Sequence, residues 1–316
     1  MSVAQKDLYD RASRATFSLL RRCNRLELPT DIMLDLFEKT IIPIMTYGCE
    51  LWGFENCEIL QKLQLKYYKI ILKLRVSTPS LMVYGETGKY PLWVTVKTRV
   101  LTYWFKLMND INQNKLASVV YRILLTLSEK GIHNNPYLMF VKTSLIEVDL
   151  SHLWLTHDTT NINLSWFKRH VKNCLQDLFI QQWFSHVDID SVYLNYRLFK
   201  DTFQQEPFLK ILPNNCSITL IRFRTTNNCL PVNVLRHEGI PREERICTKC
   251  SMQDIGDEYH YILICPFFKK KRANILPKRY IRNPNILKYN ELFNSTDKTL
   301  LLKLKHFICT INNELK

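Results

Sequence analysis

Four residues in the carboxyl-terminal third of the chain have the spacing of a metal site. Cys247, Cys250, His260 and Cys265 form the pattern C-x2-C-x9-H-x4-C. Zinc in proteins takes four thiolate or imidazole ligands in a tetrahedron, at about 2.0–2.3 Å. A C-x2-C turn presents two thiolates to one point, and a short helix can carry the histidine toward them. The pattern predicts one structural zinc ion per chain, because four protein ligands leave no open position for catalysis.

Other interpretations of these residues remain open. The chain has ten cysteines, so such a spacing can also arise by chance. Cys216 and Cys229 are further thiols nearby, but they are widely separated, which favours the compact quartet. Asp257 and Glu258 precede His260 as adjacent carboxylates, and adjacent side chains diverge on a helix. We interpret these two as solvated charges or as charges at a helix start.

The chain is strongly basic, with 44 Lys and Arg against 29 Asp and Glu in 316 residues, a net charge of +15. Residues 266–316 hold 12 of the basic residues and 3 of the acidic ones, a local charge of +9. A balance of this kind favours a polyanionic partner, nucleic acid before membrane. A solvated basic surface is the alternative.

Candidate phosphate contacts form a lysine stripe along a predicted helix over residues 58–75, and a second group in and after the zinc pattern. The stripe has a 4, 3, 4 spacing that places like charges on one face, where an anion would relieve their repulsion. The candidates are Lys62, Lys66, Lys69, Lys73, Arg242, Arg245, Lys249, Lys269, Lys270, Lys271 and Arg272.

The apolar residues recur mostly at helical spacing, and glycine is scarce, with 7 in the chain. The pattern predicts a mainly α protein. Further helices are expected over residues 7–25, 92–109, 115–130 and 166–184, whereas the two glycines and two prolines of residues 77–91 predict a loop. No apolar run approaches the ~18 residues of a membrane span. Without a secretory leader, we expect an intracellular protein, in the nucleus or the cytoplasm.

Two segments resemble one known family. Residues 240–268, IPREERICTKCSMQDIGDEYHYILICPFF, resemble the zinc-binding segment that follows the polymerase in LINE-type (non-LTR) retrotransposon reverse transcriptases. Residues 28–53 resemble the end of the thumb in the same family. The string that carries this second likeness comprises Pro43, Ile44, Tyr47, Gly48, Glu50, Trp52 and Gly53. The resemblance covers about residues 5–270, in order.

The resemblance implies thumb-like helices over 1–75, a helical linker domain over 76–205, and a CCHC zinc module with a basic tail over 206–316. The family's polymerase uses a paired-aspartate palm motif to hold magnesium, and no Asp-Asp pair occurs here. The nearest string contains Asp188 and Asp190, downstream of where a palm belongs. We therefore expect a non-catalytic carboxyl-terminal fragment that binds nucleic acid, RNA before DNA, and that could contact the missing reverse-transcriptase domains. A zinc-stabilised protein-interaction or scaffold module is the alternative.

Overall fold

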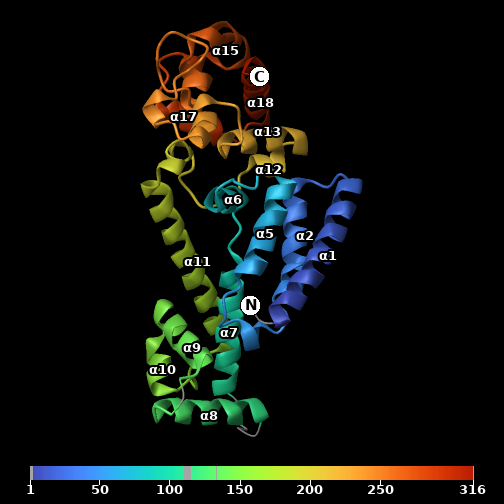
Figure 1. The fold of residues 1–316 in the computed structure, drawn as a ribbon, viewed down its shortest axis with the longest axis vertical. Coiled ribbons are helices and arrows are strands. Elements are labelled where there is room, and N and C mark those ends of the chain that lie inside the picture. Colours follow the sequence, from blue (N-terminus) through green and yellow to red (C-terminus); the bar gives the residue numbers. More distant parts are fainter. Residues whose placement is uncertain (1–2, 110–114, 133, 316) are drawn as a thin grey trace. The chain divides into compact units, whose positions relative to one another are not determined.

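The computed structural model describes residues 3–109, 115–132 and 134–315, and these residues are mainly helical (Figure 1). The predicted mainly α class is therefore confirmed. Within these ranges the β contribution is one isolated antiparallel bridge between Ile246 and Ile255. No helix in the same ranges has the length and apolar content needed to cross a membrane.

The helices follow one another along the chain with short connections. Their bounds are α1 Val3–Arg25, α2 Thr30–Thr40, α3 Ile42–Met45, α4 Cys49–Trp52, α5 Glu58–Ile71, α6 Ser80–Thr87, α7 Leu92–Met108, α8 Leu116–Glu129, α9 Pro136–Glu147, α10 Ser151–Thr156, α11 Leu164–Ile189, η1 Ser191–Tyr193, η2 Tyr196–Leu198, α12 Phe208–Ile211, α13 Asn214–Arg224, α14 Pro231–Val234, η3 Leu235–Glu238, η4 Arg242–Glu244, η5 His260–Ile264, η6 Pro266–Phe268, α15 Lys269–Ile275, α16 Lys278–Ile281, α17 Ile286–Phe293 and α18 Lys298–Glu314.

The chain forms two compact units, each built from three separate segments. Unit 1 consists of Met1–Leu19, Phe37–Gln64 and Tyr90–Gln182, and unit 2 consists of Leu20–Leu36, Leu65–Lys89 and Trp183–Lys316. The domain borders expected after residues 75 and 205 both fall inside unit 2. Compactness in this chain therefore depends on contacts between segments that are distant in sequence.

Unit 1 is organised around α7, which packs against α4, α8 and α9. Its buried face includes Val96, Val100 and Trp104, as the helical spacing predicts. The Trp104 indole donates a hydrogen bond to the Tyr121 hydroxyl of α8, 2.8 Å away. The polar end of this buried aromatic side chain is thereby satisfied inside the core.

Unit 2 contains the whole carboxyl-terminal part of the chain, with α18 as its central helix. Helices α13, α15 and α17 pack against α18, and so does the turn η5. The side chains of α18 that face them recur at helical spacing and are buried, namely Leu300, Leu301, Leu304, Phe307, Ile308 and Ile311. The turn that carries two predicted zinc ligands thus packs against the apolar face of α18.

The prediction of a loop over residues 77–91 is wrong, because this segment contains α6. Pro79 stands at the amino-terminal cap, and Gly88 ends the helix in a left-handed conformation at φ 62°. The prolines and glycines therefore mark the ends of a short helix. Gly85 inside α6 allows a close approach, since an added Cβ would lie 2.6 Å from the Tyr196 hydroxyl and 2.8 Å from the buried ring of Trp183.

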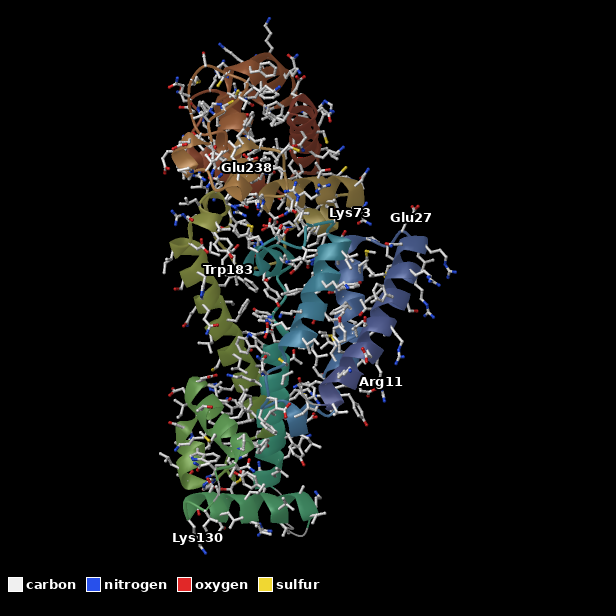
Figure 2. The ribbon with its side chains drawn as sticks, viewed as in Figure 1. Arg11, Glu27, Lys73, Lys130, Trp183 and Glu238 are labelled. Carbon is white, nitrogen blue, oxygen red and sulfur yellow. The ribbon has the colours of Figure 1, made fainter. Side chains whose placement is uncertain are left out.

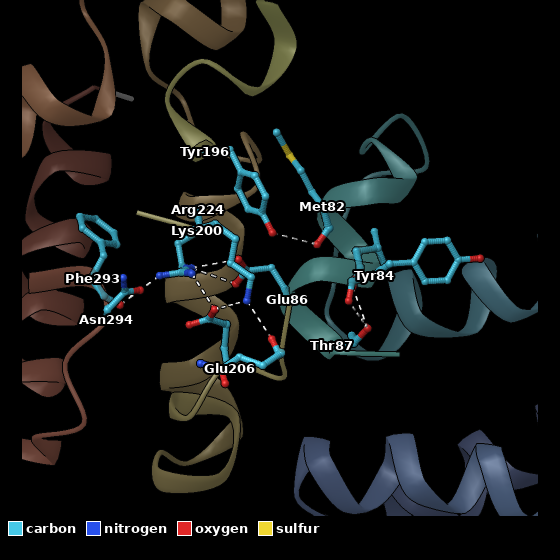
Figure 3. A network of polar contacts seen from close by, with 12 residues as sticks. Met82, Tyr84, Glu86, Thr87, Tyr196, Lys200, Glu206, Arg224, Phe293 and Asn294 are labelled. Carbon is cyan, nitrogen blue, oxygen red and sulfur yellow. Dashed lines mark hydrogen bonds and ion pairs between the residues drawn. The ribbon is translucent and has the colours of Figure 1, made fainter. Parts of the chain in front are cut away.

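Helix α6 also carries one member of a buried cluster of charges (Figure 3). The Arg224 Nε donates to Glu86 at 2.9 Å, and Arg224 Nη2 lies 3.0 Å from Glu206. Lys200 pairs with the same Glu206 carboxylate. These four side chains are at most 5% exposed, and their formal charges cancel. Burial raises the pKa of Glu86, and Arg224 opposes that shift.

Several helix boundaries differ from the sequence-based expectation, among them the ends of α5 and α11. Helix α5 ends at Ile71 and not at residue 75, and Lys73 then adopts a left-handed conformation at φ 51°. Helix α11 extends five residues beyond the predicted end, to Ile189. The first difference matters for the lysine stripe, because it removes Lys73 from the helix.

Candidate metal centre

The first two candidate ligands lie in a closed loop of unit 2. The bridge between Ile246 and Ile255 joins the two ends of this loop. The Cys247 amide donates to the Asp254 carbonyl at 2.8 Å, which tightens the loop further. Inside it, the Lys249 amide donates to the Cys247 sulfur at 3.4 Å. Such N–H···S bonds favour the thiolate, the form that binds metals.

The other two candidate ligands lie at the two ends of the turn η5. The Asp257 carboxylate accepts a hydrogen bond from the His260 amide at 2.9 Å, so Asp257 caps the start of this turn. The Cys265 amide donates to the His260 carbonyl at 2.7 Å. Pro266 follows and ends the turn. The wide π-helical turn brings together two residues that five positions would separate on an α-helix.

The four donor atoms converge on one point. One sulfur or nitrogen atom from each of Cys247, Cys250, His260 and Cys265 lies within 4.8 Å of all the others. The Cys247 and Cys265 sulfurs are 3.9 Å apart. The Cys250 sulfur and His260 Nε2 are 3.4 Å apart. A tetrahedron with bonds of about 2.3 Å to sulfur and 2.0 Å to nitrogen requires about 3.8 Å and 3.5 Å between such atoms. The cluster could hold a metal ion in this geometry.

The histidine is oriented for ligation by its other ring nitrogen. His260 Nε2 faces the cysteines, while Nδ1 lies 3.4 Å from the Asp254 carboxylate. A carboxylate behind a ligating histidine selects its tautomer and strengthens it as a donor. Burial lowers the pKa of His260, which favours the neutral ring that a metal needs.

The thiols differ in their readiness to lose a proton. Burial alone would raise the pKa of Cys247, but contacts with Tyr261 and the backbone amide of Lys249 outweigh it and lower that pKa. Burial raises the pKa of Cys265 to about 12. Cys265 is therefore protonated at neutral pH in the metal-free chain, and a metal ion must displace that proton.

Arg272 is part of the framework of the cluster and is not a surface cation. It is 3% exposed. Its guanidinium donates to the carbonyls of Ile262 at 2.7 Å and Cys265 at 2.9 Å, on the turn between the last two ligands. This position contradicts the expectation that Arg272 contacts phosphate at the surface.

Glu258 is likewise buried, at 2% exposure, so its interpretation as a solvated charge is wrong. Its carboxylate accepts hydrogen bonds from the amide groups of Asn228 at 3.0 Å and Asn233 at 2.6 Å. These bonds attach the start of the ligand-bearing turn to α14 and the segment before it. The sequence indicated Glu258 as a helix-start residue, which is correct, but gave no signal for its asparagine partners.

The predicted lysine stripe is interrupted. Lys62 and Lys66 are exposed on α5, and Lys62 forms an ion pair with Glu58 at 2.6 Å. The Lys69 ammonium donates to the Val76 carbonyl at 2.7 Å, and burial lowers its pKa. Lys73 is exposed but lies beyond the end of the helix (Figure 2). The four lysines therefore do not form one continuous charged face.

Basic residues near the metal cluster fall into two groups. Arg242 and Arg245 are engaged inside unit 2: Arg242 donates to Asn195 at 2.9 Å, and Arg245 donates to the Ile240 carbonyl at 2.8 Å. Members of the second group are exposed or half-buried at the surface, namely Lys249, Lys269, Lys270 and Lys271.

The cluster contains neither Cys216 nor Cys229, in agreement with the preference for the compact quartet. Compared with known proteins, the chain matches no protein-family model, no curated protein and no solved structure.

Proposed function

We propose that this protein binds nucleic acid, RNA before DNA, through a basic surface supported by a structural zinc ion. In this proposal it is a non-catalytic part of a LINE-type reverse transcriptase. The observation that carries the proposal is the converging set of three thiols and one imidazole. This donor set is typical of structural zinc, which fills all four positions with protein ligands.

The net charge of +15 supports the choice of partner. Exposed lysines on α5 and near the cluster present their ammonium groups at the surface, where phosphates can reach them. The zinc would hold the loop of Cys247 against the turn of Cys265, and so keep the second group of lysines in place. Catalysis has no part in this proposal.

The first experiment measures metal content by mass spectrometry on the purified full chain. We expect one zinc ion per chain, and its loss in the Cys247→Ser, Cys250→Ser double variant. The matched control is the Cys216→Ser, Cys229→Ser double variant, which changes two thiols outside the cluster and should keep the metal. A well-folded wild-type chain without zinc would contradict the proposal.

The second experiment measures binding of a fluorescent single-stranded RNA by anisotropy at several salt concentrations. About 6–10 phosphate contacts on a single strand would lower the affinity by about 300- to 16,000-fold between 50 and 200 mM salt. A response to salt that is flat would refute the nucleic-acid proposal and leave the metal site untouched.

One observation favours a second candidate, a protein-interaction module. Unit 1 has an apolar groove of about 470 Å³, lined in part by Leu51, Phe54, Leu107, Val120 and Tyr137. Leu51 is 70% exposed there. This candidate predicts partner binding that survives about 0.5 M salt, where exposed charge pairs are screened, and no binding of RNA.

A further inference from the structure

An aromatic ring lies exposed beside the metal cluster. Phe267 follows the ligand Cys265 by two positions and is 46% exposed. The next residue, Phe268, is fully buried and meets the Phe267 ring edge-on, with centroids 4.9 Å apart. The Phe267 side chain is therefore anchored at one edge, while nearly half of its surface remains open.

A lysine from the other half of the cluster reaches the same ring. The Lys249 ammonium lies 5.9 Å from the centroid of Phe267. Lys249 belongs to the C-x2-C loop, where its amide is bonded to the Cys247 sulfur. In the sequence, Phe267 follows the fourth ligand, and Lys249 stands between the first two. The cluster itself thus brings the ring and the charge together.

A second ammonium group lies nearby. Lys271 lies in the first turn of α15, the helix that begins two residues after Phe267. It forms an ion pair with Glu314 of α18. The Lys271 ammonium lowers the pKa of the Glu314 carboxyl, and Lys249 acts in the same direction. The Glu314 carboxylate, paired with Lys271, is an anion in the position that a phosphate would take.

We propose that Phe267, Lys249 and Lys271 form a binding site for a single-stranded nucleic acid. One base stacks on the Phe267 ring, and the flanking phosphates bind the two ammonium groups, with Glu314 displaced. The inference rests on the proposed function and specifies the form of nucleic acid and its place on the chain.

Single strands fit this site better than duplexes for a geometric reason. An aromatic platform accepts any base, because every base has a π face, and basic side chains follow the backbone. The bases of a duplex already use both faces in their own stack. Lys249 must leave the ring when a base arrives, which its flexible four-carbon side chain permits.

The test measures binding of labelled oligothymidylate and oligouridylate of about 12 nucleotides, and of a duplex of the same length, to the full chain. Phe267→Ala should weaken single-strand binding roughly 5- to 100-fold, leave duplex binding unchanged and leave the salt slope unchanged. Phe267→Trp should retain binding, with the added indole fluorescence quenched by the oligonucleotide.

The charged residues have a different readout. Lys249→Ala and Lys271→Ala should each reduce the slope of log affinity against log salt by about 0.7, the value for one phosphate contact on a single strand. Glu314→Gln should strengthen binding by up to about fivefold, because it removes a competing carboxylate from an exposed ion pair.

Matched controls exist in the same unit. Leu287→Ala removes an apolar side chain that is 80% exposed on α17, and Lys298→Ala removes an exposed lysine at the start of α18. Both should bind like the wild type. Zinc content and circular dichroism of each variant establish that it is folded. Neither the retained binding of Phe267→Trp nor the stronger binding of Glu314→Gln can result from a loss of structure.

Three outcomes would overturn the inference. If Phe267→Ala binds single strands as the wild type does, stacking on this ring is refuted while the proposed function stands. If Phe267→Ala weakens duplex and single-strand binding equally, the single-strand assignment is refuted. If the wild type binds neither, the proposed function fails as well. A preference between oligothymidylate and oligouridylate assigns the strand to DNA or RNA.

Discussion

Replacing Arg272 by methionine should weaken zinc binding without unfolding the rest of unit 2. The substitution keeps most of the side-chain volume but removes the guanidinium. The carbonyls of Ile262 and Cys265, and that of Tyr261 at 3.3 Å, then lose their donor. These carbonyls shape the turn that separates His260 from Cys265, so the last two ligands lose their support.

The size of the effect follows from two contributions. Removing a group that orients metal ligands typically costs 10- to 100-fold in metal affinity, or about 1.4–2.8 kcal/mol. The charge acts in the same direction. Three thiolates around a divalent ion leave a net negative charge, which the buried Arg272 cation balances. Burial lowers the pKa of Arg272 to about 10, and the Cys265 thiolate opposes that shift. Metal binding deprotonates Cys265, so Arg272 should favour the loaded form over the metal-free form.

The assay is competition with a chromophoric zinc chelator at pH 7. We expect the dissociation constant of Arg272→Met to rise about 10- to 100-fold. The dissociation constant of Arg272→Lys should lie between those of the wild type and Arg272→Met, because lysine keeps the charge and loses the fork geometry. Arg279→Met is the control, since Arg279 has a side chain that is 63% exposed and pairs with Glu291. An unchanged dissociation constant for Arg272→Met would refute the assigned role of this residue.

Three further predictions concern burial and protons. Arg224→Met leaves Glu86 buried without its main partner, and should cost about 3–5 kcal/mol of unfolding free energy at pH 7, measured by chemical denaturation. Burial raises the pKa of Glu86, so this loss of stability should be smallest near or below about pH 4, where the carboxyl is protonated in the folded and the unfolded state. The loss should grow as the pH rises, and a loss that does not depend on pH would contradict the prediction. Zinc affinity should rise with pH, by up to about tenfold per pH unit for each displaced proton, because Cys265 has a pKa near 12 without metal. Proton release on zinc addition, followed with an indicator dye, checks this prediction. Gly85→Ala should destabilise the fold by about 1–3 kcal/mol, because its Cβ would lie 2.8 Å from the Trp183 ring; a thermal midpoint equal to that of the wild type would show that the ring yields without cost.

Features with a local origin were predictable from the sequence. The helical spacing of apolar residues predicted α7 within one residue at its end, and the C-x2-C-x9-H-x4-C pattern predicted the four residues that converge. A helix period and a ligand spacing are both encoded within a few residues of chain. The same locality explains why Asp257 or Glu258 could be expected to begin the turn that carries His260.

Features that depend on distant partners were not predictable in this way. Glu86 and Arg224 are 138 positions apart, and nothing in either neighbourhood signals the other. The segment of α6 has loop-like prolines and glycines, and becomes a helix because Gly88 ends it in a left-handed conformation and its side chains are buried. Glu258 and Arg272 have ordinary surface types and are buried by partners from other elements.

The sequence by itself therefore determined the helical class, the basic charge and the identity of the four converging residues, because each depends on composition or on short-range spacing. Only the tertiary structure decided which charged residues remain available to a partner. It buried Arg272 behind the ligands and left Phe267 open beside Lys249. Which side chains are buried and which stay exposed depends on packing between segments far apart in the chain. Burial of a polar side chain is tolerated only where another element supplies its hydrogen bonds.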